Sequence, residues 1–170
     1  MKENFTSALA LMLAHEGGFV DHPKDPGGMT NLGVTKATWE AYVGHPVTEA
    51  DMRALTASTV GPLYRRKYWD ACNCDDLPEG LDYAVFDFAV NSGPGRAVKT
   101  LQTLLGVAAD GALGPKTLAA IKTTDLNLLV PAYNTARHEF LRSLPTYSVF
   151  GRGWARRVEE VAEVSGQMVG

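Results

Sequence analysis

Residues 15–35, HEGGFVDHPKDPGGMTNLGVT, follow a stretch of helical periodicity and place a glutamate on its apolar face. The preceding residues 4–15 have the spacing of a helix with one buried stripe, formed by Phe5, Leu9, Met12 and Leu13. Glu16 continues this stripe four residues after Met12 and stands just before a diglycine, which is typical of a helix end. Loss of solvation and the negative end of the helix dipole both favour the neutral carboxyl. Glu16 is therefore a candidate general acid.

The loop that follows, residues 20–28, contains two prolines and two glycines. The prolines restrict the backbone, so Asp21 and Asp25 are expected at set positions, and Thr30 comes shortly afterwards. Two carboxylates and a positioned water are the minimum equipment for glycoside hydrolysis. The alternative, a solvated surface glutamate at a helix end, stays open on the residues alone.

The string E-G-G-F-V-x-x-P-x-D-P-G-G-x-T-x-x-G-V-T, which begins at Glu16, resembles the signature of glycoside hydrolase family 108, the N-acetylmuramidases of phage endolysins and related bacterial muramidases. Residues 64–97, 101–121 and 150–158 resemble the same family in the same order. The string at 101–121, L-Q-x-x-L-G-V-x-x-D-G-x-x-G-P-x-T-L, also resembles a short peptidoglycan-binding module. The resemblance implies a mainly α, lysozyme-like fold, hydrolysis of the β-1,4 bond between N-acetylmuramic acid and N-acetylglucosamine in peptidoglycan, and Glu16 as the catalytic acid.

The second carboxylate has two candidates. The spacing resembles that of phage lysozymes of the T-even type, which have eight residues between their catalytic glutamate and aspartate, as lie between Glu16 and Asp25. Their threonine follows after five more residues, whereas only four lie between Asp25 and Thr30, so Asn31 occupies the corresponding position. We favour Asp25 with help from Thr30, and Asp21 remains the alternative.

Two segments interleave aromatic and basic side chains, YRRKYW at 64–69 and RGWARR at 152–157. Such patterns can stack on sugar rings and attract an anionic wall polymer, although the aromatic residues of such a segment can equally belong to the core. The residues that we expect to bind substrate are Asp21, Tyr64, Tyr68, Trp69 and Asn91. Asn91 lies in an N-x-G motif at a predicted helix end, so a role as helix cap is the alternative.

Periodicity and turn signals predict the other elements. A short β-hairpin is expected near the active-site loop, around residue 20 and residues 33–35. Thr35 and the Thr48–Asp51 pair are expected to cap helices, and Gly61-Pro62 is expected to start a helix late or to kink it. Helices are predicted over residues 35–42, 58–69, 81–91, 96–105, from 115, 126–143 and 152–168.

The 170 residues, 45% of them apolar, suit one compact structural domain. We expect a lysozyme-like catalytic region over 1–96 and a peptidoglycan-binding-like helical region over 97–170 packed on it. The net charge of −3 gives no general basic face for nucleic acid. Two readings compete with a muramidase: a lytic transglycosylase acting on the same bond, and a non-catalytic peptidoglycan-binding module.

The two cysteines, Cys72 and Cys74, are too close in sequence to bond to each other easily, which suggests a reducing cytoplasm. The four histidines show no ligand spacing, so no metal or other cofactor is expected. No stretch approaches the roughly eighteen apolar residues of a membrane span. We expect a monomer, made in the cytoplasm without a signal peptide, that reaches the cell wall after holin- or lysis-dependent release.

Overall fold

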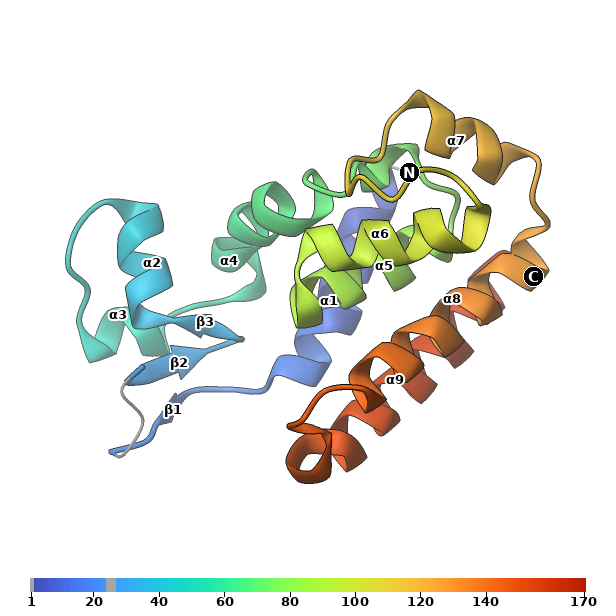
Figure 1. Cartoon of the computed structure of the whole chain (residues 1–170). Coiled ribbons are helices and arrows are strands. Elements are labelled where there is room, and N and C mark those ends of the chain that lie inside the picture. Colours follow the sequence, from blue (N-terminus) through green and yellow to red (C-terminus); the bar gives the residue numbers. More distant parts are fainter. Residues whose placement is uncertain (1, 24–26) are drawn as a thin grey trace. The chain divides into compact units, whose positions relative to one another are not determined.

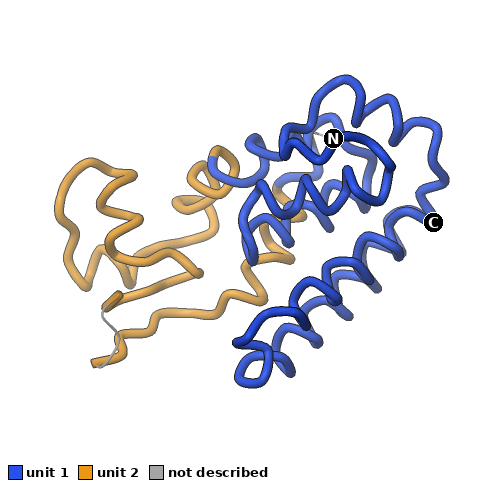
Figure 2. Tube along the Cα trace, in the orientation of Figure 1, with its two compact units in different colours: residues 1–5, 67–170 blue, residues 6–66 orange. Residues whose placement is uncertain are grey.

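The computed structural model describes residues 2–23 and 27–170, and most of these residues are helical (Figure 1). The chain divides into two compact units (Figure 2). The larger unit comprises Met1–Phe5 and Lys67–Gly170, and the smaller unit comprises Thr6–Arg66.

The first long helix, α1 (Phe5–Glu16), confirms the predicted apolar stripe. All four of its predicted stripe residues are buried, and Met12 is completely so. The helix ends at Glu16 because Gly17 takes a positive φ of 77°, a conformation that side-chain-bearing residues rarely adopt. The stop signal read from the diglycine is thus confirmed.

The smaller unit also contains a three-stranded antiparallel sheet in the order β1 (Val20–Asp21), β2 (Met29–Asn31) and β3 (Val34–Thr35). Strands form at both predicted places, but they do not pair with each other as the predicted hairpin required, because the sequence prediction missed the middle strand β2 that lies between them. A strand of three residues is too short to display alternation. Leu32 and Gly33 join β2 to β3 with positive φ angles of 51° and 76°, as a two-residue type I′ turn requires.

Three helices complete the smaller unit: α2 (Lys36–Val43), α3 (Glu49–Arg53) and α4 (Ala57–Tyr64). Thr35 caps α2 and the Thr48–Asp51 pair forms a capping box on α3, both as predicted. Helix α4 does not begin late at its proline, because a capping box at Thr56 fixes its start before Pro62. A π-helical turn, η2 (Arg65–Trp69), follows α4 in place of the predicted continuous α-helix.

The larger unit is built around α5 (Leu81–Ser92), which contacts the short helix η3 (Cys74–Asp76) and three longer helices. The longer helices are α6 (Pro94–Leu105), α8 (Leu126–Arg142) and α9 (Tyr147–Val169), of which α8 and α9 pack along each other (Figure 1). Residues Leu81–Ala89 are all buried, so α5 is covered on every side rather than on the single face that periodicity predicted. The short helices η1 (Lys2–Asn4), η3 (Cys74–Asp76) and α7 (Pro115–Lys122) complete this unit.

The predicted mainly α, lysozyme-like fold with a small sheet after the first long helix is confirmed. Among the described residues, no helix combines the length and the apolar character needed to cross a membrane.

Candidate active site

Glu16 occupies the last position of α1, where the buried stripe of the helix reaches the surface. Its side chain is half-buried, one turn after the completely buried Met12. The carboxyl group therefore stands at the edge of the apolar face and at the negative end of the helix dipole, as predicted.

The turn between β2 and β3 lies directly against this carboxyl group. A Cβ atom placed on Gly33 would be 2.9 Å from Glu16 Oε2 and 3.1 Å from Glu16 Cδ. The same atom would be 2.6 Å from the hydroxyl oxygen of Tyr64. The Glu16 carboxyl and the Tyr64 hydroxyl thus both occupy the space that a side chain at residue 33 would take.

Tyr64, the last residue of α4, fixes the same turn from another side. Its hydroxyl donates a 2.7 Å hydrogen bond to the carbonyl oxygen of Leu32. Leu32 holds a left-handed backbone conformation, which costs free energy for a residue with a branched side chain. With 3% of its surface exposed, the Tyr64 ring is not the sugar-stacking platform that the sequence suggested. Its hydroxyl, however, does reach the Glu16 neighbourhood.

Asn31 anchors the middle strand to α3. Its buried side-chain amide donates a 2.8 Å hydrogen bond to the carbonyl oxygen of Met52. Asn31 holds the position that lysozyme spacing gives to a threonine, and its contact is an internal tie between elements. Thr48 in turn stabilises α3, because its hydroxyl accepts a hydrogen bond from the Asp51 backbone amide. Hydrogen bonding from Thr48, above all from its backbone amide to the Asp51 carboxylate, lowers the pKa of Asp51.

The sheet register separates two of the predicted polar residues. Thr30 pairs with Val20, and Asp21 pairs with Met29. Successive residues of a strand point to opposite faces, so the side chains of Thr30 and Asp21 lie on opposite faces of the sheet. Thr30 is half-buried and Asp21 is exposed. Asp25, the favoured second carboxylate, lies outside the described residues.

A contact that the sequence prediction missed involves the glycine-rich motif itself. The guanidinium of Arg53, at the end of α3, lies 4.0 Å from the centre of the Phe19 ring. Arg53 is also paired with Glu49 at 3.0 Å. This cation–π contact ties the segment after Glu16 to α3. The sequence offers no signal for it, because the two residues lie far apart in the chain.

The prediction that Trp69 binds substrate is wrong. Trp69 has no exposed surface and stacks edge-on against Phe5 at 5.3 Å and Phe86 at 5.4 Å. Its indole nitrogen donates a 2.9 Å hydrogen bond to Asp75. Tyr68, one residue earlier, is half-buried, and Lys67 Nζ lies 5.6 Å from its ring centre. Trp69 is therefore a core residue of the larger unit.

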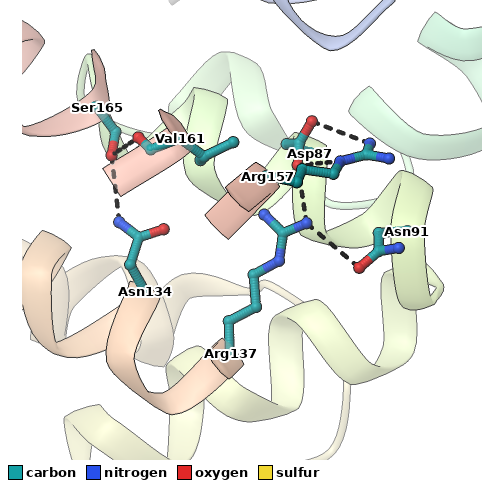
Figure 3. A network of polar contacts seen from close by, with 7 residues as sticks. All are labelled: Asp87, Asn91, Asn134, Arg137, Arg157, Val161 and Ser165. Carbon is teal, nitrogen blue, oxygen red and sulfur yellow. Dashed lines mark hydrogen bonds and ion pairs between the residues drawn. The ribbon is translucent and has the colours of Figure 1, made fainter. Parts of the chain in front are cut away.

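Asn91 belongs to a buried polar network in the larger unit (Figure 3). Arg137 donates a 3.3 Å hydrogen bond to Asn91 Oδ1 and forms a 2.8 Å ion pair with Asp87. Arg157, expected among the wall-facing cations, is paired with Asp87 at 3.0 Å instead. Gly93 rather than Asn91 is the C-cap of α5. A role for the half-buried Asn91 in substrate binding stays a prediction.

Comparisons with known proteins match both the first and the second half of the chain. The family model described as Glycosyl hydrolase 108 matches residues 9–93, and the model described as Predicted Peptidoglycan domain matches residues 96–159. The solved structure of Brucella abortus SagA is similar to this chain with 44% sequence identity and a TM-score of 0.86. That similarity covers 99% of this chain and 97% of the SagA chain. No curated protein matches the chain.

Proposed function

This chain belongs to the glycosyl hydrolase 108 family, and we propose that Glu16 is the general acid with which it hydrolyses peptidoglycan. The chain is a glycoside hydrolase of the muramidase type, and a predicted peptidoglycan domain follows its hydrolase region. Its substrate bond is the β-1,4 linkage between N-acetylmuramic acid and N-acetylglucosamine, and its site of action is the bacterial cell wall.

The position of the Glu16 carboxyl is the observation that supports its role as the general acid. It combines an apolar helix face, a helix C-terminus and the bare backbone of Gly33, on which a Cβ atom would stand 2.9 Å from Glu16 Oε2. A general acid must be held against a fixed backbone while one side remains open to the substrate. The half-buried state of Glu16 supports this role.

In the proposed reaction, Glu16 transfers its proton to the glycosidic oxygen as the bond to the anomeric carbon breaks. The departing sugar leaves as an alcohol, and the positive charge that develops on the remaining ring is quenched by water. A second carboxylate accepts a proton from that water. We propose Asp25 for this role with help from Thr30, and Asp21 remains the alternative. An inverting course follows if the second carboxylate activates water directly.

Glu16→Gln tests the acid. Glutamine keeps the size of the side chain but cannot donate the proton, so hydrolysis of purified peptidoglycan should fall by at least about 10²-fold. Glu163→Gln, on an exposed position of α9, is the matched control and should keep full activity. Both proteins should unfold at the temperature of the parent. More than a few per cent of parental turnover in Glu16→Gln means that another residue is the acid.

The two aspartates are separated by the same kind of substitution. Asp25→Asn should reduce turnover strongly, because the base must reach the water, whereas Asp21→Asn should reduce it mildly. The reverse order of effects assigns the second carboxylate to Asp21. Mass spectrometry of the products distinguishes hydrolysis, which leaves a reducing muramic acid, from transglycosylation, which leaves an anhydro sugar.

We propose further that this activity lyses bacteria in the manner of a phage endolysin, with the enzyme acting as a monomer. A fall in turbidity of a suspension of bacterial cell walls, absent with Glu16→Gln, supports lysis. Release of the enzyme to the wall through a holin or through host lysis is part of the same proposal.

A further inference from the structure

We infer that the β2–β3 turn is a positioning device for the catalytic acid, in which Gly33 leaves room for the Glu16 carboxyl and Tyr64 holds the turn in place. The inference rests on the proposed function of Glu16. Neither Gly33 nor Tyr64 needs to touch the substrate for this role.

Gly33 meets two separate requirements at once. Its φ of 76° belongs to the left-handed region, which favours glycine. Its missing side chain is also required, because a Cβ would stand 2.6 Å from the Tyr64 hydroxyl and 2.9 Å from Glu16 Oε2. Contacts this short do not occur for real Cβ atoms, so an alanine would displace the carboxyl, the tyrosine or the turn. Among the described residues, most of the other glycines with a positive φ lack this second requirement.

Tyr64 holds the turn in its position beside Glu16 through a hydrogen bond. Leu32 and Gly33 both hold left-handed backbone conformations. This conformation is unfavourable for a leucine such as Leu32. The 2.7 Å hydrogen bond from the Tyr64 hydroxyl to the Leu32 carbonyl offsets part of this cost. Because Tyr64 is buried at the end of α4, its hydroxyl is a fixed point to which the turn is attached.

The consequence for catalysis is geometric. A shift of about 1 Å in a catalytic group can reduce turnover by roughly 10²-fold without removing any reacting atom. The turn limits the positions that the Glu16 carboxyl can take, so a change at residue 33 should act on kcat and leave the binding of the polymer, and hence KM, nearly unchanged.

The experiment compares Gly33→Ala with Gly44→Ala on soluble peptidoglycan fragments. Gly44 has a similar positive φ of 84° at the end of α2, but a Cβ there would meet no atom within 4 Å. Both variants therefore strain the backbone, but only in Gly33→Ala does the new Cβ atom collide with the Glu16 carboxyl and the Tyr64 hydroxyl. We expect kcat to fall roughly 10²-fold for Gly33→Ala and less than about threefold for Gly44→Ala, at similar melting temperatures.

Tyr64→Phe removes only the hydroxyl and should lower kcat roughly tenfold. The double variant Gly33→Ala/Tyr64→Phe should be no less active than Gly33→Ala alone, because both changes act on one arrangement and the phenylalanine relieves the 2.6 Å contact. Two results overturn the inference while Glu16→Gln is inactive and the proposed function stands. One is an equal kcat for Gly33→Ala and Gly44→Ala. The other is a kcat of the double variant that falls by the product of the two single losses. An active Glu16→Gln instead overturns the proposed function and the inference together.

Discussion

Replacing Asp87 by asparagine should lower the free energy of unfolding by about 3–5 kcal/mol, the range for removing one partner of a buried ion pair. Asp87 and Arg137 are both completely buried, and their ion pair measures 2.8 Å. Arg157 donates two further hydrogen bonds to the same carboxylate, at 3.0 and 3.1 Å (Figure 3). Asparagine keeps the shape but removes the charge that two guanidinium groups share.

The loss of stability in Asp87→Asn should be large because Arg137 would remain buried. Its Nε and Nη1 atoms are buried and have no hydrogen-bond partner among the described residues. The cation is therefore held by Asp87 and by the amide oxygen of Asn91. Without the carboxylate, a buried positive charge would face a second one, and both would be only partly compensated.

The effect should depend on pH with a definite sign. Burial alone would raise the pKa of Asp87, but the charges of Arg137 and Arg157 together hold it below its ordinary value. A lowered carboxyl pKa stabilises the folded state above the unfolded-state pKa of about 4, and this contribution is lost as the pH falls through the folded-state pKa. The difference between parent and Asp87→Asn should thus be largest above about pH 5 and shrink below about pH 4.

Urea unfolding followed by circular dichroism between pH 3 and pH 7 measures this difference. At neutral pH the melting temperature should fall by roughly 6–20 °C. Glu49→Gln, which breaks the exposed pair with Arg53, is the control and should cost less than about 1 kcal/mol. Asp87→Asn/Arg137→Met should be more stable than Asp87→Asn, because it removes the stranded charge. A loss for Asp87→Asn as small as the control, or one that does not change with pH, would refute the reasoning.

Three further changes test other parts of the molecule. Asn31→Ala should cost about 1 kcal/mol because the buried hydrogen bond that joins β2 to the Met52 carbonyl is lost, and a thermal melt unchanged from the parent would contradict this. Gln102→Leu should cost about 2–3 kcal/mol and speed amide exchange at Gly111, whose backbone amide donates to Gln102 Oε1 at 2.9 Å; slow exchange would exclude the role. Truncation after Arg96 removes α6, α8 and α9 from around α5, so the fragment should aggregate, and a soluble, active fragment would show two independent domains.

Local signals allowed much of the fold to be predicted. The stripe of α1 follows from spacing within a single helix, and the caps at Thr35 and Thr48 depend on residues three positions away. Glu16 could be placed at a helix end on an apolar face for the same reason. Each of these features involves a contact between near neighbours in the chain, which the order of residues specifies directly.

The contacts that surround Glu16 could not be predicted, because they join residues from separate elements. Nothing in the sequence pairs Gly33 with Tyr64, and the glycine alone indicated only a turn. Tyr68 and Trp69 are adjacent and similar in kind, yet the first is half-buried and the second is completely buried. Their burial differs because the segment after α4 is a π-helical turn, and hydrophobic periodicity does not predict such a turn.

The buried network gave a partial signal. Asp87 lies within the apolar run AVFDFAV, and a carboxylate in such a run requires a cationic partner when it is buried. The chain has 16 lysines and arginines, and no local pattern selects Arg137 and Arg157 among them. The existence of a buried ion pair could thus have been anticipated, whereas its partners depend on the packing of α8 and α9 against α5.

The two units differ in how far their helices are buried. Substitutions that lower folding stability should therefore differ from those that disturb the geometry around the catalytic acid. The larger unit has a fully covered central helix, whereas α2 has no buried residue and α3 has only Met52. Two single hydrogen bonds, from Asn31 and Tyr64, attach the sheet and its turn to α3 and α4. Regions with few buried apolar contacts shift at low cost in free energy. Substitution of Asp87 should therefore destabilise the larger unit, whereas loss of one hydroxyl at Tyr64 should move the turn, and with it the acid, with little change in stability.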